Sequence, residues 1–212
     1  MDAPRNRRIR PRRRTVNAAG RVRMKIAMGC NGAGSRINSF ALVSYLPEPL
    51  AGFFDNLRSE LVPACSAKAH VTVLPPRPLQ CPPEDAWEEL KDNLQDFQPF
   101  RVDLAEVEIF AVTQVIYVSV STGTGELKRM HATLNSGRLQ FTEPFRYCPH
   151  ITLAQELDPA RVEAAAALAG SRWREFSHSR SFTVGRLTFV QNTLENRWTD
   201  LAGCSLSERV TI

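Results

Sequence analysis

The chain has 212 residues, of which 43% are hydrophobic and 23% are charged, a composition ordinary for a globular protein with a hydrophobic core. No apolar run approaches the roughly 20 residues of a membrane helix, so we expect no membrane-spanning segment. The net charge of +5 is unevenly distributed, because residues 1–25 hold ten basic residues and one acid, and the remainder holds seventeen basic and twenty-one acidic residues. We therefore expect a mildly acidic body with a basic tail.

Residues 1–36 form this tail and a linker. The first fourteen residues carry seven arginines with almost nothing apolar between them, which predicts a disordered segment. The segment is interpreted either as a nucleic-acid-binding arm or as a non-native extension. Gly29 to Ser35 is rich in glycine but lacks the Gly-Lys-Ser/Thr ending of a phosphate-binding loop, so it is interpreted as a flexible linker.

The first half of the body alternates strands and helices. Apolar runs predict strands at residues 39–46, at 69–74, ended by two prolines, and at 100–110, with a bulge in the last. Apolar residues at helical spacing predict helices at 50–61 and 84–97. The order is therefore strand, helix, strand, helix, strand.

The second half repeats this order. Strands are expected at residues 115–120, 150–154, about 180–190 and about 196–206. One helix should be capped by Thr124 and stop near Gly137, and another should start at Asp158-Pro159 and end at Gly170. The repeated order indicates an internal duplication within one domain, residues 37–212, with lobes of about 37–112 and 113–212 and possible exchange of strands between them.

One short pattern occurs once in each half. His70-Val71-Thr72-Val73 and His150-Ile151-Thr152-Leu153 both read His, β-branched apolar, Thr, apolar. Since side chains alternate between the faces of a strand, the His and the Thr of each motif share one face. A single histidine before an apolar strand is more often structural than catalytic. The matched position of both motifs in the two halves favours a shared site, where two imidazoles and two hydroxyls face one cavity.

The other two histidines lack this context. His131 lies on a predicted helix and His178 in a polar turn, so both are expected to be structural or on the surface. The histidines form no metal-binding cluster, and we expect neither metal nor cofactor. The five cysteines are odd in number and widely spaced, which argues against a disulfide framework and fits a reducing, cytoplasmic location.

The paired motifs and their contexts, HVTVLPPRPL and FRYCPHITLA, resemble the 2H phosphoesterases, and within them the bacterial 2′-5′ RNA ligase-like and cyclic phosphodiesterase proteins. The resemblance covers residues 38–206. It implies an α+β fold in which two duplicated β-α-β-α-β lobes, related by a pseudo-two-fold axis, flank a central cleft between two antiparallel sheets.

The resemblance also implies metal-independent opening of a 2′,3′-cyclic phosphate on RNA or a nucleotide, by a monomer. His70 would be the acid and His150 the base, although the residues alone allow the exchange of these roles. Thr72 and Thr152 would donate to phosphate oxygens. Arg77, Arg146 and Tyr147 are secondary candidates, for phosphate pairing or base stacking, and equally for packing at the cleft rim.

Two alternatives remain at this point. The same site could join RNA ends in the manner of a 2′-5′ RNA ligase, because a ribose hydroxyl can replace water as the nucleophile. The chain could instead be an RNA-binding module whose phosphate site does not turn over, although both motifs retain the acid–base groups that turnover needs.

Overall fold

The computed structural model describes residues 35–63, 65 and 67–207. The first strand, β1, begins at Arg36, so the arginine-rich tail and nearly all of the expected linker lie outside the described residues. Among the described helices, none combines the length and the apolar character needed to cross a membrane.

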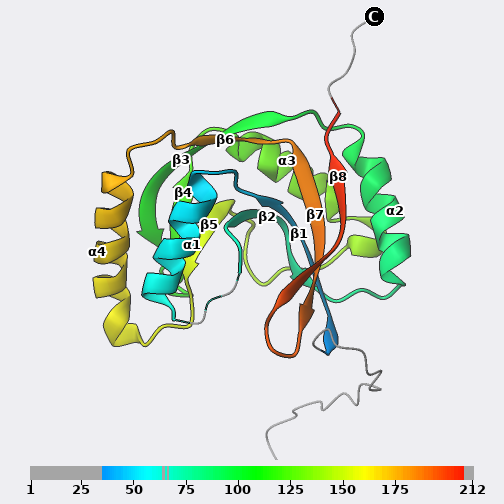
Figure 1. Cartoon of the computed structure of the whole chain (residues 1–212). Coiled ribbons are helices and arrows are strands. Elements are labelled where there is room, and N and C mark those ends of the chain that lie inside the picture. Colours follow the sequence, from blue (N-terminus) through cyan, green and yellow to red (C-terminus); the bar gives the residue numbers. More distant parts are fainter. Residues whose placement is uncertain (1–34, 64, 66, 208–212) are drawn as a thin grey trace, which may run out of the picture. The chain divides into compact units, whose positions relative to one another are not determined.

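The described strands form two antiparallel sheets of four strands each, which confirms the expected α+β class (Figure 1). The first sheet has the order β2-β1-β7-β8 and the second the order β5-β4-β3-β6. The strands of the first sheet are β1 (Arg36–Tyr45), β2 (His70–Arg77), β7 (Arg186–Thr193) and β8 (Trp198–Ser205). Those of the second sheet are β3 (Phe100–Ile109), β4 (Ile116–Val120), β5 (His150–Ala154) and β6 (Ser181–Val184).

Each sheet takes strands from both halves of the chain. The strand pair β1 and β2 is completed by β7 and β8, and β3 joins the sheet of β4, β5 and β6. The two motif strands, β2 and β5, occupy the same edge position in their respective sheets. Strand β2 pairs with β1 and strand β5 pairs with β4, and in both cases a helix lies between the two strands in the sequence. A duplication predicts this correspondence.

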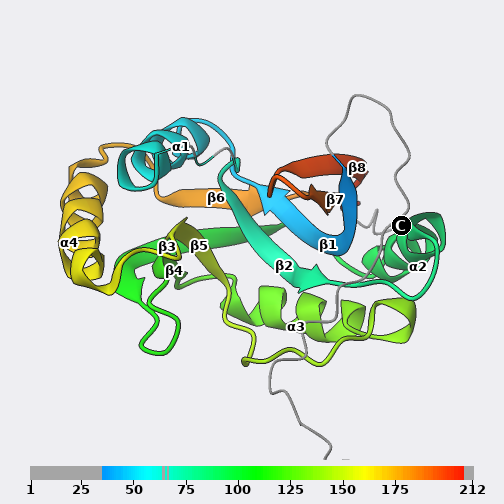
Figure 2. The same cartoon turned by 90° about the horizontal axis from the view of Figure 1, so that it is seen from below.

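Four helices pack on the two sheets, two on each. The helices are α1 (Leu50–Leu61), α2 (Pro83–Leu94), α3 (Thr124–Leu134) and α4 (Pro159–Glu175), with a short 3-10 turn at Gly137–Leu139. Helix α1 packs on β5 and α4 on β3, whereas α2 packs on β8 and α3 on β2, an arrangement that Figure 2 shows from below. One helix of each half, α1 and α3, therefore packs on the motif strand of the other half.

One continuous apolar core joins both sheets to the helices. It includes Leu42 of β1, Phe54 of α1, Val118 of β4 and Trp173 of α4, each with 0% of its surface exposed. A smaller cluster of Ala41, Val43 and Val190 lies on the other face of the first sheet. The odd-numbered residues of β1 thus face away from the core, as the period of two in a strand requires.

The expected strand at about 180–190 is wrong, because it is two strands in different sheets. Residues of β6 pair with β3, and those of β7 pair with β1. Gly185 separates them, and the chain passes from one sheet to the other at this residue. The apolar pattern continues across Gly185 since both strands bury alternate side chains, so the periodicity gave no signal of the crossing.

Three element ends also differ from the expected ones. Strand β2 continues through Pro75 and Pro76 to Arg77, which an edge strand tolerates because one side of its backbone needs no ladder partner. Thr124 does not cap α3, since its hydroxyl donates to the carbonyls of Val120 and Ser121 and the N-cap is Gly123. Helix α4 does not end at Gly170.

Helix α4 runs five residues further, to Glu175, because its apolar face continues. Ala169 and Trp173 are both buried, and the indole Nε1 of Trp173 donates to the carbonyl of Ala105 at 2.6 Å. The start of α4 is as expected, with Asp158 accepting a hydrogen bond from the amide of Ala160 at 2.9 Å and Pro159 in the first turn. The expected bulge in β3 is present as a register shift between Leu104 and Val107.

Candidate active site

The two motifs lie at the beginnings of the two edge strands. His70 is the first residue of β2 and His150 is the first residue of β5, and these two strands pack against each other. The alternation within each motif is as expected. The apolar residues of both motifs expose at most 1% of their surface: Val71, Val73, Ile151 and Leu153. Both His and both Thr side chains are half-buried.

The two imidazoles are held by the same local hydrogen bond. Nδ1 of His70 lies 2.7 Å from the carbonyl of Lys68, and Nδ1 of His150 lies 2.7 Å from the carbonyl of Cys148. Since a carbonyl can only accept, each Nδ1 carries the proton of the neutral ring. In both residues Nε2 is therefore the nitrogen left to accept or donate a proton in a reaction.

The hydroxyls of the motif threonines are also available. Neither Thr72 nor Thr152 makes a side-chain hydrogen bond to another described residue. A threonine hydroxyl can donate to a phosphate oxygen, so both side chains keep the capacity that the sequence assigns to them.

Aromatic rings lie beside each imidazole. Tyr45, opposite His70 on β1, meets it edge-on with ring centroids 6.5 Å apart. His150 has Phe110 and Tyr117 edge-on at 5.0 and 5.3 Å, and these two rings stack on each other. The rings restrict the rotation of both imidazoles and limit their contact with water.

Both histidines are hard to protonate in this environment. Burial lowers the pKa of His70 to about 4, and the positive charges of Arg58 and His150 add to this effect against the opposing hydrogen bond to Lys68. Burial also lowers the pKa of His150. The contribution of His150 to the lowered pKa of His70 indicates that the two imidazoles, 80 residues apart in the sequence, lie near each other.

Arg58 is a residue that the sequence did not single out. It lies on α1, is 7% exposed, and donates from Nη1 to the carbonyl of Lys68 at 3.4 Å, the same carbonyl that anchors His70. Its Nε is buried without a hydrogen-bond partner. Nothing in the local sequence distinguishes Arg58 from a surface arginine of an amphipathic helix, so only the fold could have revealed it.

Arg77 and Tyr147 have packing roles. Arg77 is 2% exposed, and its guanidinium bonds Glu143 at 2.6 Å, Asn135 at 2.6 Å and the carbonyl of Leu139 at 2.9 Å, so it is buried in contacts within the protein. The ring of Tyr147 stacks on His131, with centroids 4.0 Å apart and planes at 2°. A base therefore cannot stack on that face of Tyr147.

The hydroxyl of Tyr147 connects the two motifs. It donates to the backbone carbonyl of Thr72, in the first motif, at 2.8 Å. Tyr147 itself lies three residues before His150, which begins the second motif. Glu143 accepts hydrogen bonds from both Arg77 and His131, at 2.6 and 2.9 Å, and so fixes the ring under Tyr147. His131 is thus structural, as expected, and exposed His178 contacts only Phe176. Of the secondary candidates, Arg146 alone is exposed and without a partner among the described residues.

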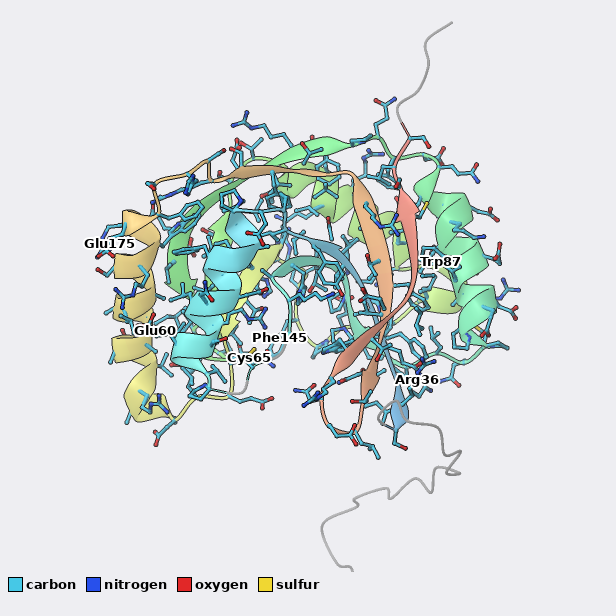
Figure 3. The ribbon with its side chains drawn as sticks, in the orientation of Figure 1. Arg36, Glu60, Cys65, Trp87, Phe145 and Glu175 are labelled. Atoms are coloured by element: carbon cyan, nitrogen blue, oxygen red, sulfur yellow. The ribbon has the colours of Figure 1, made fainter. Side chains whose placement is uncertain are left out.

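A cavity of about 570 Å³ lies on the first sheet, and its lining includes Tyr45 and Lys68, the residues that contact His70. Tyr45, Lys68, Arg186, Thr188, Asp200 and Gly203 are among the residues that line it. Figure 3 shows Phe145 and Cys65 between α1 and the β7–β8 hairpin, with Phe145 belonging to the loop that leads into β5. In the described part of the chain, no group of three His, Cys, Asp or Glu side chains could hold a metal ion.

The family model of the 2′-5′ RNA ligase superfamily matches residues 46–196, and so includes both motifs. The chain belongs to the 2′-5′ RNA ligase superfamily. Two curated bacterial proteins are similar to this superfamily member, and the name of each describes it as an inferred phosphoesterase. The protein of Oceanobacillus iheyensis is 32% identical over 34% of this chain and 42% of its own length. That of Bacillus cytotoxicus is 28% identical over 61% of this chain and 77% of its own length.

Solved structures confirm the fold of this superfamily member. A crystal structure of Escherichia coli LigT with 3′-AMP has a TM-score of 0.56 at 15% identity and covers 83% of this chain and all of LigT. LigT with NADP⁺ gives 0.54 at 16% identity, over 82% of this chain and 99% of LigT. A structure titled phosphoesterase gives 0.56 at 16% identity, over 83% of this chain and all of its own. The arrangement of two exchanged, four-stranded antiparallel sheets is therefore that of the LigT-like 2H phosphoesterases.

Proposed function

We propose that this superfamily member is a metal-independent phosphodiesterase that hydrolyses the 2′,3′-cyclic phosphate of RNA ends or nucleotides. The observation that carries the proposal is the equivalence of the two histidines. Each begins an edge strand, each is anchored through Nδ1 to a carbonyl two residues earlier, and each keeps Nε2 for proton transfer.

The reaction needs one proton to be accepted and one to be donated. One imidazole takes a proton from water as the water oxygen attacks phosphorus. The other gives a proton to the ribose oxygen as its bond to phosphorus breaks, which yields a phosphomonoester on the remaining ribose position. The hydroxyls of Thr72 and Thr152 would donate to the non-bridging oxygens, where negative charge increases in the transition state. Two imidazoles supply both proton transfers, so no step requires a metal ion.

The roles of the two histidines can be argued from their charges. Burial, together with the nearby charge of Arg58, lowers the pKa of His70 to about 4, and burial lowers the pKa of His150 by less, so His150 keeps its proton to a higher pH than His70. In the unliganded protein this order favours His70 as the base and His150 as the acid, the reverse of the assignment that the resemblance implies. A bound phosphate anion would raise the pKa of the histidine that it contacts.

The test is turnover of a nucleoside 2′,3′-cyclic phosphate in excess EDTA. We expect hydrolysis by the wild type, and a loss of kcat by about 100-fold or more in His70→Ala and in His150→Ala, since each removes a proton-transfer group. His178→Ala is the matched control, because His178 is exposed and lies outside the site. Activity that appears only with added divalent metal would contradict the mechanism, and so would full activity in either motif variant.

Product analysis separates hydrolysis from ligation. With an RNA 5′-hydroxyl end in place of water as nucleophile, the same proton transfers would form a 2′-5′ linkage. Binding of the cyclic nucleotide without any product would instead favour the phosphate-binding module. We expect the phosphomonoester to be the main product, because water is far more abundant than an RNA 5′-hydroxyl end as a nucleophile.

A further inference from the structure

The face of the first sheet that carries His70 extends over two more strands. Tyr45 pairs with His70, and Val43 pairs with both Thr72 on β2 and Thr188 on β7. Residues that pair across strands lie on one face of a sheet, so the same register places Arg186 beside Tyr45 on the face of His70. The cavity of about 570 Å³ lies along this row, with Tyr45, Lys68 and Arg186 among its lining residues.

The charges in this cavity leave one cation uncompensated. Asp200 accepts a hydrogen bond from the hydroxyl of Tyr45 and lies 4.0 Å from the ammonium group of Lys68. The acid is therefore already matched by Lys68. Arg186 is exposed and has no hydrogen bond or ion pair with another described residue. An arginine held in a cavity without an acid partner is suited to bind an anion from solution.

Gly203 sets the position of this arginine. A Cβ atom at residue 203 would come within 2.4 Å of Nη2 and 2.9 Å of Cζ of Arg186. The guanidinium therefore lies against the backbone of β8, in space that a side chain would otherwise fill. The absence of a side chain at Gly203 is a second observation, independent of charge, that the cavity is built to hold the guanidinium on the sheet face.

The separation from His70 gives the scale of the ligand. Arg186 and His70 are two strand spacings apart, which is about 10 Å across the sheet. The phosphates on the 3′ and 5′ sides of one nucleoside lie somewhat closer than this, and the long side chain of Arg186 can cover the difference. With the cyclic phosphate at the His–Thr pairs, the 5′ phosphate of the same nucleoside would reach the guanidinium.

We infer that Arg186 binds the phosphate on the 5′ side of the nucleoside whose 2′,3′-cyclic phosphate is opened, so that the substrates are oligonucleotide ends or 5′-phosphorylated cyclic nucleotides. The inference rests on the proposed function for the position of the cyclic phosphate. It assigns substrate selection to residues outside both motifs.

The test compares two substrates that differ in one group, a nucleoside 2′,3′-cyclic phosphate with and without a 5′-phosphate. The wild type should prefer the phosphorylated substrate by about tenfold or more in kcat/KM, the effect expected of one charge-assisted hydrogen-bonded pair. Arg186→Ala should abolish this preference and leave kcat/KM for the unphosphorylated substrate unchanged. Arg186→Lys should restore it in part, because it keeps the charge without the planar fork.

A matched control removes the same charge elsewhere. Arg161 on α4 is exposed and, like Arg186, has no partner among the described residues. Arg161→Ala should therefore keep the full preference for the 5′-phosphate. Gly203→Val should weaken the preference with Arg186 still present, because the added side chain displaces the guanidinium. Equal kcat/KM for the two substrates in the wild type, or an unchanged preference in Arg186→Ala, would overturn the inference.

A binding measurement tests this inference independently of whether the protein hydrolyses a cyclic phosphate. Titration calorimetry with a nucleoside 3′,5′-bisphosphate and with the matching 3′-monophosphate requires no turnover. Tighter binding of the bisphosphate that is lost in Arg186→Ala would support the inference even if neither cyclic substrate were hydrolysed. Equal affinity for both nucleotides would contradict it even if hydrolysis of the cyclic phosphate were observed.

Discussion

His70 and His150 share a local geometry but differ in the charge nearby. Both rings are anchored through Nδ1 and both lose proton affinity through burial. Only His70 has a buried guanidinium beside it, from Arg58, which also donates to the carbonyl that holds His70. Burial is the main cause of both shifts, and the charge of a helix residue outside the motifs adds to the difference between the two histidines.

This environment predicts the pH dependence. In the free protein the pKa of His70 is about 4 and that of His150 is below its usual 6.5, so kcat/KM should follow a bell with its maximum on the acid side of pH 6.5. The rate falls above the maximum because the proton donor becomes neutral, and falls below it because the base becomes protonated. Arg58→Met should move the acid limb to higher pH, since it removes a positive charge that disfavours imidazolium.

The measurement is kcat/KM for a cyclic nucleotide from pH 4 to 9. A maximum at or above pH 7 in the wild type would contradict the argument from burial. An acid limb that is unmoved in Arg58→Met would remove Arg58 from the electrostatics of the site. The sequence predicts that the two histidines titrate in a useful range, but it cannot predict the direction of the pKa shifts, which depends on neighbours that only the fold brings together.

At the scale of elements, the two motif strands have no backbone ladder between them. Strands β2 and β5 are the edges of different sheets, and their relation rests on apolar packing and on the hydrogen bond from Tyr147 to the carbonyl of Thr72. The alignment of the two imidazoles consequently depends on a side chain of the loop before β5. Catalysis is sensitive to such alignment, because small displacements of reacting groups are costly in rate.

Tyr147→Phe should lower kcat severalfold and leave KM nearly unchanged. The variant keeps the ring that stacks on His131 and removes only the hydroxyl, at a cost to folding of about 1 kcal/mol. Tyr117→Phe is the comparison, because its hydroxyl bonds Glu108 within the second sheet and does not bridge the motifs. Unfolding by denaturant measures stability for both variants. Equal kcat losses in the two variants would show that Tyr147 has no special role.

Most element types could be predicted from the sequence, whereas several element ends could not. The helix at 50–61 and the strand at 150–154 have strong apolar patterns and no competing signal, and the structure has both. Gly170 is read locally as a helix stop, but burial of Trp173 one turn later outweighs the roughly 1 kcal/mol cost of a glycine within a helix. Tertiary packing decided this case, and packing partners are not visible in a local window.

For the whole molecule, the order of elements predicts the duplication but not the assignment of strands to sheets. The crossing at Gly185 brings β7 beside β1, and with it Arg186, Thr188 and Gly203 into the cavity beside His70. These residues carry no motif of their own. The site that is predicted from sequence is thus limited to the two motifs, and the rest of the wall beside His70 comes from strands that begin more than 110 residues after it.

The basic residues outside the described part of the chain should affect long substrates only. Removal of residues 1–34 should leave kcat/KM for a cyclic mononucleotide unchanged, because no proposed site residue lies there. Binding of a long RNA should weaken and depend less steeply on salt, since fewer counterions are released. Titrations at several salt concentrations measure this slope. Loss of mononucleotide activity, or an unaltered slope with long RNA, would contradict the prediction.

The exchange of strands between the sheets also governs how the protein can form on the ribosome. When β1 and β2 have been synthesised, they can make only a two-stranded pair, which is marginally stable alone in water. The third and fourth strands of that sheet end at Thr193 and Ser205. The sheet that carries His70 is therefore complete only after more than 100 residues beyond its motif strand have been translated, and the sheet that carries His150 is complete earlier, at Val184.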